Sequence, residues 1–507
     1  MKVRVRFAPS PTGGLHLGGV RTVLYNYLFA RKHGGDFVLR IEDTDQSRFV
    51  EGAEQYIIDC LNWCGLIPDE SPEKGGPFAP YRQSERKANY RQYAQKLIDE
   101  GHAYYAFDTT EDLEQMRIIY KTPENTNPQY DHSLRHKMKN SLSLPEAEVA
   151  ELLKNNTPYV IRIKMPGQKH LKFTDMIRGD VFFDCSLVDD KVLLKADGMP
   201  TYHLAVVVDD YLMNITHAFR GEEWLPSAPV HLLLWEYLGW LDNMPQWAHL
   251  PLILKPDGNG KLSKRDGDRL GFPVFAMNWA DIKTGEITKG FREIGFMPQA
   301  FVNMLAMLGW NDGTGQELFT IEELIEKFSI ERVHKGGAKF DFEKAKWFNH
   351  QYIQHTDNAT LAALALPYFE INGIKPIAEQ LEKVIALVKE RCTLLSDFWE
   401  QSSFFFIAPI TIDEKTINEK WSEQKKDFFI ALANKYSNTE DHEWNLLEIE
   451  HTFNNLVQQH AIKKGDVMLP LRIMLVGGKY GPGVFNIAEL IGKQETVARI
   501  VNAVEKL

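Results

Sequence analysis

The chain has 507 residues, more than one hydrophobic core usually holds, so we expect several domains. Hydrophobic residues make up 44% and charged residues 25%, a balance that is typical of globular proteins and excludes a disordered chain. The net charge of −11 argues against a non-specific nucleic-acid binder, which usually carries a positive field, and DNA is not an expected partner.

Targeting signals and metal-binding patterns are not evident in the sequence. No apolar run approaches the roughly 20 residues that span a bilayer, and residues 1–7 lack the apolar core of a signal peptide. We therefore expect a cytoplasmic protein without membrane contact. Cys60 and Cys64 could share a helix face, but no histidine or second cysteine pair follows at zinc-site spacing, so we expect no metal site and free thiols.

The N-terminal residues have the pattern of a strand, a loop, a helix and a second strand. Residues 2–8 alternate polar and apolar side chains, which is strand periodicity. Prolines and glycines exclude regular structure up to about Gly19, a helical pattern then continues to Gly34–Gly35, and residues 36–43 resemble another strand. This order is typical of the start of a parallel, doubly wound α/β sheet.

Residues 86–200 interrupt that rhythm with a mixture of predicted helix, loop and short strands. A helix is predicted from Arg86 to Gly101, a polar loop over residues 122–133, and strands around residues 159–164 and 181–194. We interpret this part as an inserted α+β domain. The sheet is predicted to resume with a strand at 201–210, and its last strand is predicted at 249–254.

The pattern is helical from about residue 270 almost to the end of the chain. Helices are predicted over 300–308, 321–328, 379–395 and 425–435. The predicted domains are a split Rossmann-like sheet domain (1–85 and 201–256), the insertion (86–200), a helical domain that begins with a basic loop (257–345) and a second helical domain (346–507).

The loop at residues 8–19 is the first candidate for chemistry. Its glycines let the backbone approach a ligand closely, and the following helix offers free N–H groups that suit a phosphate. His16, followed by Gly18 and Gly19, adds a further donor. The glycine spacing does not match the usual dinucleotide fingerprint, and an ordinary strand-to-helix turn with a capping histidine is the alternative.

The loop at residues 256–267 is the second candidate. It is rich in glycine and contains Lys261, Lys264 and Arg265, so it suits a flexible clamp on a polyphosphate transition state. An exposed basic turn is the alternative.

Together the two loops resemble the two signature motifs of class I aminoacyl-tRNA synthetases. The wider resemblance is to bacterial-type glutamyl-tRNA synthetases and runs in order along roughly the first 310 residues. It is carried by Arg6–Gly13, Leu39–Asp45, Pro80–Arg86, Pro200–His203, Val207–Asp210 and Arg220–Trp224. Gly19 replaces the second histidine of the common first motif, and Leu262 and Arg265 replace a methionine and a serine of the second; these variants are similar to the glutamyl branch.

The resemblance implies a ligase that activates L-glutamate with ATP and transfers it to the 3′ end of tRNA(Glu). Mg²⁺ would accompany ATP. His16, Lys264 and Lys261 are the implied catalytic residues, with Lys264 stabilising the transition state, and Trp224 is expected beside the ATP site. The implied ATP-binding residues are His16, Gly18, Gly19, Glu223, Lys261, Ser263, Lys264 and Arg265.

A glutamate pocket needs a guanidinium for the side-chain carboxylate and an anion for the ammonium group. Arg6 and Arg220 are the candidates for the carboxylate and Glu42 for the ammonium, with further contacts expected from Ala8, Ser10 and Tyr202. A solvated strand face is the alternative for Arg6, and a surface ion pair is the alternative for Arg220.

The remaining expectations concern tRNA. The insertion would hold the acceptor end, and its stretch Tyr104–Thr109, which matches a zinc-binding segment of some relatives, has no cysteine, so no zinc is predicted. The C-terminal half would bind the anticodon, and Arg391 is a candidate contact there. The protein is expected to be a monomer. A cluster of basic and aromatic residues is a candidate tRNA contact, with a solvated helix and core aromatics as the alternative: Lys335, Lys339, Lys344, Lys346, Phe340, Phe342 and Trp347.

Four other functions fit the sequence less well. A glutaminyl-tRNA synthetase would have a β-barrel anticodon region, whereas this half is predicted to be helical. A shorter paralogue that modifies tRNA lacks that half. A nucleotidyltransferase without an RNA partner would have no use for it, and an RNA-binding module would not need both ATP motifs.

Overall fold

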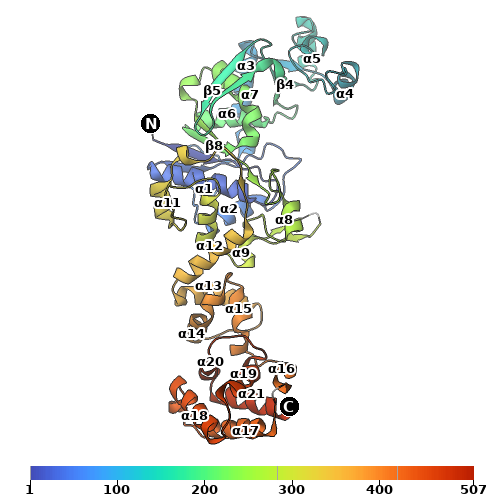
Figure 1. Cartoon of the computed structure of the whole chain (residues 1–507). Coiled ribbons are helices and arrows are strands. Elements are labelled where there is room, and N and C mark those ends of the chain that lie inside the picture. Colours follow the sequence, from blue (N-terminus) through green and yellow to red (C-terminus); the bar gives the residue numbers. More distant parts are fainter. Residues whose placement is uncertain (1, 283, 420) are drawn as a thin grey trace. The chain divides into compact units, whose positions relative to one another are not determined.

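The computed structural model describes residues 2–282, 284–419 and 421–507 (Figure 1). The chain divides into two compact units. The first comprises the residues up to Glu293 together with Pro298–Phe342, and the second comprises Ile294–Met297 and Glu343–Leu507. No described helix is long and apolar enough to cross a membrane.

A four-stranded parallel sheet lies at the centre of the first unit, in the order β2–β1–β8–β9. Its strands are β1 (Arg4–Phe7), β2 (Asp36–Leu39), β8 (His217–Gly221) and β9 (Gln246–Leu250). The predicted first strand, helix and second strand are confirmed, with helix α1 (Leu17–Lys32) between β1 and β2. The expected alternation in β1 does not give a solvated face, because Arg4 and Arg6 are both buried.

The strand predicted at 201–210 is wrong, because these residues form helix α6 (Tyr202–Leu212). Its residues Leu204–Asp210 are all buried, and a helix buried on nearly all sides has the same continuous apolar run as a buried strand. The next strand of the sheet is β8 instead. The strand predicted at 249–254 is divided into β9 and β10 (Ile253–Leu254), and β10 pairs with β13 (Ala338–Lys339) outside the central sheet.

The insertion is a mixture of helices and antiparallel strands, as predicted. Three strands form one sheet in the order β3–β4–β7, and β5 and β6 form a hairpin. The elements are α3 (Lys87–Asp99), β3 (Ala103–Ala106), α4 (Thr110–Ile119), α5 (Glu146–Lys154), β4 (Val160–Ile163), β5 (His170–Asp175), β6 (Gly179–Asp184) and β7 (Val192–Leu194). Their core continues into α6 and α7 (Ala228–Tyr237), which ties the insertion to the central sheet.

Short elements complete the first unit. They are α2 (Ala53–Trp63), the 3₁₀ helix η4 (Glu222–Ser227), α8 (Lys264–Leu270), the hairpin β11 (Trp279–Ala280) and β12 (Ile287–Thr288), α9 (Phe291–Ile294), α10 (Pro298–Met307) and α11 (Ile321–Lys327). Helix α1 packs on β1, β2 and β8, and α10 and α11 pack against α1.

The described part of the second unit is helical, as predicted. Its helices are α12 (Phe342–His355), α13 (Asn358–Glu370), α14 (Ala378–Val388), α15 (Asp397–Ser402), α16 (Glu414–Asn418), α17 (Glu423–Ser437), α18 (Leu446–Gln459), α19 (Lys464–Val476), α20 (Val484–Ile491) and α21 (Lys493–Lys506). The helix predicted over 379–395 ends early, at Val388, and a 3₁₀ turn (Lys389–Arg391) follows it.

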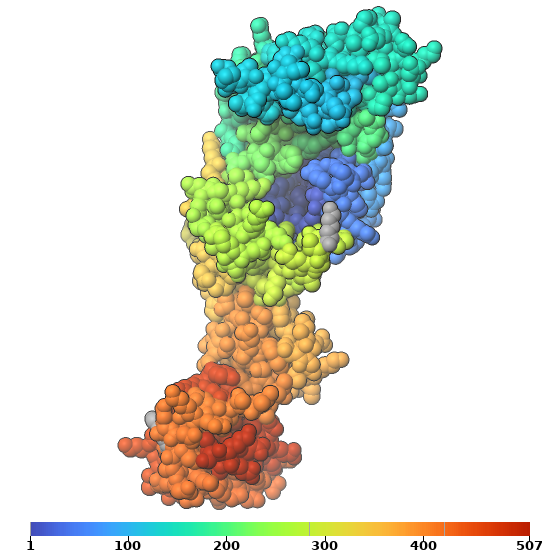
Figure 2. Space-filling view, turned by 90° about the vertical axis from the view of Figure 1, so that its right-hand side faces the viewer, coloured from blue at the N-terminus to red at the C-terminus, as the bar shows by residue number. Residues whose placement is uncertain are grey.

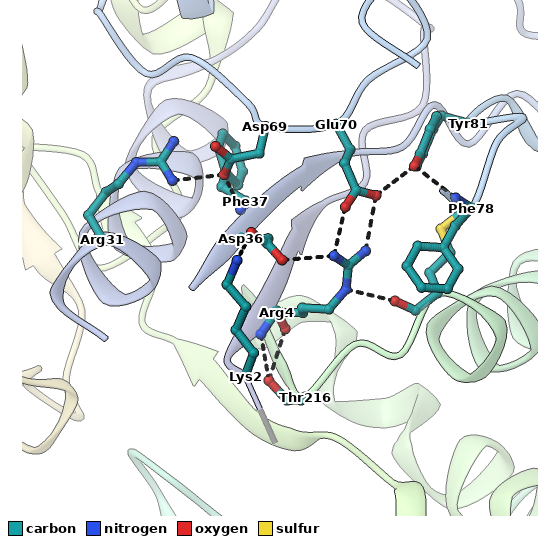
Figure 3. A network of polar contacts seen from close by, with 11 residues as sticks. Lys2, Arg4, Arg31, Asp36, Phe37, Asp69, Glu70, Phe78, Tyr81 and Thr216 are labelled. Atoms are coloured by element: carbon teal, nitrogen blue, oxygen red, sulfur yellow. Dashed lines mark hydrogen bonds and ion pairs between the residues drawn. The ribbon is translucent and has the colours of Figure 1, made fainter. Parts of the chain in front are cut away.

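A network of ion pairs fixes strand β1 from one side (Figure 3). The Arg4 guanidinium donates to both oxygens of Glu70, at 2.6 and 3.0 Å, and to Asp36 at 3.0 Å. The Tyr81 hydroxyl donates to Glu70 at 2.6 Å, and the Phe78 ring lies 4.6 Å from the Arg4 guanidinium carbon. The buried cation is therefore matched directly by two carboxylates.

Candidate active site

A cavity of about 1060 Å³ lies in the first unit, at the carboxyl ends of β1 and β8. Figure 2 shows this unit hollowed between its blue N-terminal part and its yellow-green part. The cavity brings together most of the residues predicted from the sequence: Arg6, Ala8, Ser10, His16, Gly18, Gly19, Glu42, Tyr202, Arg220, Glu223, Trp224, Lys261, Ser263 and Lys264. Arg265 is exposed and does not line it.

His16 is the N-cap of α1 and is held as a neutral imidazole. Its Nδ1 accepts the main-chain N–H of Gly18 at 3.4 Å, so the proton belongs on Nε2. Burial, and then the nearby Lys261, lower the pKa of His16 to about 4. No described residue bonds to Nε2, so His16 presents a free N–H donor at the start of a helix.

The two glycines after His16 have different roles. A Cβ on Gly18 would meet no atom within 4 Å, whereas a Cβ on Gly19 would lie 2.7 Å from Cδ1 of Leu15. Gly19 therefore allows close packing of the loop, and Gly18 leaves open space beside the helix N-terminus.

The basic loop places two lysines at the cavity, each opposite a carboxylate. Lys261 Nζ lies 2.6 Å from Glu223, and Lys264 Nζ lies 3.6 Å from Glu286. Ser263 caps α8 through a bond from its hydroxyl to Asp266 at 2.6 Å, which fixes the start of the helix that carries Lys264. Both ammonium groups are exposed enough to exchange these partners for a ligand's phosphates.

Arg220 is 7% exposed and forms no ion pair with any described carboxylate. Its Nε donates to His249 at 2.9 Å, and its Nη1 lies 2.9 Å from the Tyr202 hydroxyl and 3.1 Å from His231 Nδ1. Its guanidinium carbon lies 5.1 Å from the Trp247 ring centre. Nη2 has no partner among the described residues, which leaves a buried cation with an open donor.

Arg6, in contrast, is already ion-paired. Its Nε and Nη2 both donate to Asp210 at 3.2 Å, and Asp210 also pairs with Arg40 at 2.9 Å. Arg40 donates to Glu42 at 3.0 Å, the only described bond to that carboxylate. Burial is the main influence on Glu42 and raises its pKa, although Arg40 and Arg6 oppose the shift.

Several residues around the cavity were not identified from the sequence. Asp210 pairs with Arg6 from α6, and His231 and His249 contact Arg220 from α7 and β9. Arg21 lines the cavity while its guanidinium donates to the carbonyls of Pro251 and Leu308. These partners come from distant segments, so no spacing in the sequence indicates them.

The described residues contain no group of three histidine, cysteine, aspartate or glutamate side chains able to hold a metal. The four cysteines are free and buried, and burial raises the pKa of Cys60 to about 12. A resident metal would therefore have no obvious ligand set in this part of the chain. An Mg²⁺ ion that arrives with ATP would take its ligands chiefly from the phosphates.

The predicted basic and aromatic cluster is only partly a surface feature. Phe340 is buried and packs on Phe272 with ring centres 5.1 Å apart, so for this residue the alternative, a core aromatic, is the one that the structure supports. In the second unit, Lys344 lies 3.7 Å from the ring centre of Trp347, and Lys346 pairs with Glu343 at 2.8 Å. Arg391 is exposed.

Comparisons with known proteins agree with this geometry. The family model "tRNA synthetases class I (E and Q), catalytic domain" matches residues 2–347, and "Anticodon binding domain" matches residues 360–504. The chain is 54% identical to a glutamate–tRNA ligase of Christiangramia forsetii and 53% identical to one of Porphyromonas gingivalis; each match covers 100% of this chain and 99% of the relative.

The solved structures give the same result. A crystal structure of a glutamate tRNA ligase from Elizabethkingia meningosepticum in complex with its amino acid has a TM-score of 0.93 and 48% identity, with 100% of both chains covered. The glutamate-tRNA synthetase of Elizabethkingia anophelis has a TM-score of 0.91 at the same identity and coverage. The chain belongs to the class I tRNA synthetases of the glutamate and glutamine branch, and within it to the glutamate–tRNA ligases.

Proposed function

We propose that this protein activates L-glutamate with ATP and attaches it to the 3′ end of tRNA(Glu). Arg220 is the observation that carries the choice of glutamate. A buried guanidinium without a carboxylate partner is costly, and an anionic ligand in the cavity would offset that cost. The side-chain carboxylate of glutamate supplies the anion.

The rest of the amino acid would be held by groups on both sides of Arg220. Glu42 would accept from the ammonium group, because only Arg40 bonds its carboxylate among the described residues. Tyr202 and Ser10 would add neutral hydrogen bonds, and Ala8 and Arg6 would border the ligand. Arg6 would act mainly through its pair with Asp210, since that pair already uses two of its donors.

The same arrangement selects against glutamine. An amide in place of the carboxylate would leave the charge of Arg220 unmatched, and only its carbonyl oxygen could accept from the guanidinium. A pocket built for one hydrogen-bonding group rejects its analogue by large factors, on the order of 10⁴-fold in similar synthetase sites.

ATP would bind at the His16 end of the cavity. His16 Nε2 would donate to the phosphates, which would lie in the open space beside Gly18 and Gly19 at the N-terminus of α1. Lys261 and Lys264 would leave Glu223 and Glu286 to follow the negative charge that develops during the reaction. The surrounding ATP contacts would come from Glu223, Trp224 and Ser263 in the cavity and from the exposed Arg265, which follows Lys264 in α8 outside the cavity lining. Mg²⁺ would be bound to the phosphates.

Two transfers complete the proposed reaction. The α-carboxylate of glutamate attacks the α-phosphorus of ATP, and pyrophosphate leaves to give glutamyl-adenylate. A hydroxyl of the terminal ribose of tRNA(Glu) then attacks the glutamyl carbonyl, and AMP leaves. The protein's part is to position the reactants and to stabilise charge.

The tRNA would extend over both units. Residues 86–200 would hold the acceptor end, residues 257–345 the stem, and residues 346–507 the anticodon. We expect a cytoplasmic monomer that needs no zinc.

The deciding experiment is ATP-dependent charging of purified tRNA pools with radiolabelled glutamate and, separately, with glutamine. Glutamate on tRNA(Glu) is the expected product. Glutamate on tRNA(Gln) as well would keep the chemistry and mark a non-discriminating enzyme, whereas charging with glutamine would overturn the role given to Arg220.

ATP–pyrophosphate exchange in the presence of tRNA tests the ATP end separately. His16→Ala and Lys264→Ala should lower the exchange rate by about 100-fold each, because each removes a donor from the transition state. Arg269→Ala is the matched control, since this exposed cation of α8 does not line the cavity. Equal losses in all three variants would contradict the ATP assignment.

A further inference from the structure

A buried aspartate and a histidine lie next to Arg220, in line with the Nε–H group of its guanidinium. Asp175 ends strand β5 of the insertion, and His249 lies in β9; both side chains are fully buried. Asp175 Oδ2 is 2.6 Å from His249 Nδ1, and His249 Nε2 is 2.9 Å from Arg220 Nε. Asp175, His249 and Arg220 therefore form one continuous chain of hydrogen bonds.

The direction of each bond in this chain is fixed by Arg220. An arginine Nε–H can only donate, so His249 Nε2 must accept and carry no proton. The proton of the neutral ring is then on Nδ1, where it is donated to Asp175. Burial is the main influence and lowers the pKa of His249, which agrees with a neutral ring between the two charges.

We propose that Asp175 and His249 are positioning residues that hold Arg220 in the orientation needed to select glutamate. This inference rests on the proposed role of Arg220. The His249 bond on Nε and the Tyr202 and His231 contacts on Nη1 fix the plane of the guanidinium and leave Nη2 for the ligand.

Asp175 reaches Arg220 only through the His249 ring, and this indirect contact favours binding of a substrate. Where a carboxylate contacts an arginine directly, as Asp210 contacts Arg6, it takes Nε and Nη2 together. At Arg220 a neutral imidazole takes only Nε, and the negative charge of Asp175 remains behind it. The guanidinium is oriented while its charge and one donor stay available for a substrate carboxylate.

Asp175→Asn is the sharpest test because it should reverse the imidazole tautomer. Oδ1 of Asp175 accepts the N–H groups of Ile177 and Arg178, both at 2.9 Å, so the new amide NH₂ would oppose two donors there. It should instead take the Oδ2 position, where only one main-chain donor, the N–H of His249 at 3.1 Å, opposes it, and donate to His249 Nδ1. His249 Nε2 would then carry the proton and face the Nε–H of Arg220, donor against donor.

The expected result is a rise in the KM for glutamate on the order of 100-fold in tRNA charging, with the KM for ATP unchanged. The preference for glutamate over glutamine should fall with it. Spectra of ¹⁵N-labelled histidine should move the His249 proton from Nδ1 to Nε2. An unchanged KM for glutamate, or equal changes in both KM values, would overturn the proposal.

A pair of His249 variants keeps the test decisive if Asp175→Asn folds poorly. His249→Gln retains an oxygen that can accept from Arg220, whereas His249→Phe does not, so the KM for glutamate should rise much more in the phenylalanine variant. His217→Gln is the matched control, a histidine on the same strand as Arg220 that does not line the cavity. Equal KM values for glutamate in His249→Gln and His249→Phe would refute the positioning role.

Arg220→Gln separates this inference from the function on which it rests. If that variant keeps the parent KM for glutamate, the proposed function fails. If it loses glutamate binding while Asp175→Asn and His249→Phe keep it, only the positioning role fails.

Discussion

Arg4 and Arg220 lie on neighbouring strands of one sheet and are almost equally buried, at 8% and 7% exposure, yet their surroundings are opposite. Arg4 is ion-paired with Glu70 and Asp36 (Figure 3). Arg220 is bonded to a tyrosine and to imidazole nitrogens, and one of its donors has no partner.

The difference separates a structural cation from a ligand-binding one. The charge of Arg4 is matched within the fold, so that residue stabilises β1 and has little left to offer a ligand. The charge of Arg220 is oriented but not matched by a direct partner, so part of its stabilisation must come from a bound anion. Replacing each arginine should therefore affect different measurements.

The largest effect is expected from Arg220→Gln. Removing the guanidinium should lower kcat/KM for glutamate by about 10³-fold, which corresponds to about 4 kcal/mol of lost transition-state binding. The KM for ATP should stay the same, because the described hydrogen bonds of Arg220 go to His249, Tyr202 and His231 and not to His16, Lys261 or Lys264. Steady-state tRNA charging at varied glutamate and varied ATP measures both.

The folding of this variant is its internal control. No carboxylate loses a direct partner, so the unfolding free energy should change by about 1 kcal/mol at most. A large loss of stability, or an equal loss of ATP affinity, would show that Arg220 belongs to the same class as Arg4.

Arg4→Met should give the reverse result. Glu70 and Asp36 would lose their shared partner, and breaking a buried ion pair in this way costs about 3–5 kcal/mol. Hydrogen exchange of peptides from β1 and β2 measures the local free energy of opening. The KM for glutamate should not change in the folded fraction, and adding Glu70→Gln should recover part of the stability.

Acid should destabilise the histidines around Arg220 and the ion pairs around Arg4 in different pH ranges. Burial lowers the pKa of His231 and His249 below the ordinary 6.5, so below that pH the unfolded chain binds more protons than the folded one. The pKa of Asp36 is lowered by Lys2 and Arg4, which outweigh its burial, so its contribution persists until the pH falls below about 4.

Between pH 7 and pH 5, both histidines should therefore lower the unfolding free energy as the pH falls. Hydrogen exchange of the β8 and β9 peptides, corrected for the intrinsic effect of pH, measures this loss. His249→Gln should reduce the slope, and Asp36→Asn should leave it unchanged over this range. A slope unaffected by His249→Gln would place the acid sensitivity elsewhere.

The spacing of apolar residues in the sequence was sufficient to predict helices and strands that have one exposed face or a clear end. The first strand, α1 and the helical C-terminal half follow from it, since glycines end α1 and several later helices, such as α14 and α18, bury one apolar face. It failed at α6, because Leu204–Val208 is a continuous apolar run with no polar face to set a period. The strand β8 was missed because five residues, buried at their centre, have too short a pattern.

The site was predictable only as far as it lies on the two loops. His16, Lys261 and Lys264 are near glycines that mark a ligand approach, and the structure brings them to one cavity. The surroundings of Arg220 could not be predicted, because Asp175 and His249 come from separate segments that meet only in the fold. Likewise, Arg6 is paired by a residue 204 positions away.

The smallest and most closely matched test compares two tyrosines. Tyr202→Phe removes the hydroxyl that accepts from Arg220 Nη1, and Tyr81→Phe removes the hydroxyl that donates to Glu70 beside Arg4. One hydrogen bond to a charged group is lost in each case, worth about 1–2 kcal/mol. His231 still contacts Nη1, so Tyr202→Phe should raise the KM for glutamate by roughly 10-fold with little change in stability. Tyr81→Phe should lower the stability of β1 and β2 and leave the KM for glutamate unchanged. If both variants changed only stability, Tyr202 would stabilise the fold as Tyr81 does, and its contact with Nη1 would not be needed to orient Arg220 for glutamate.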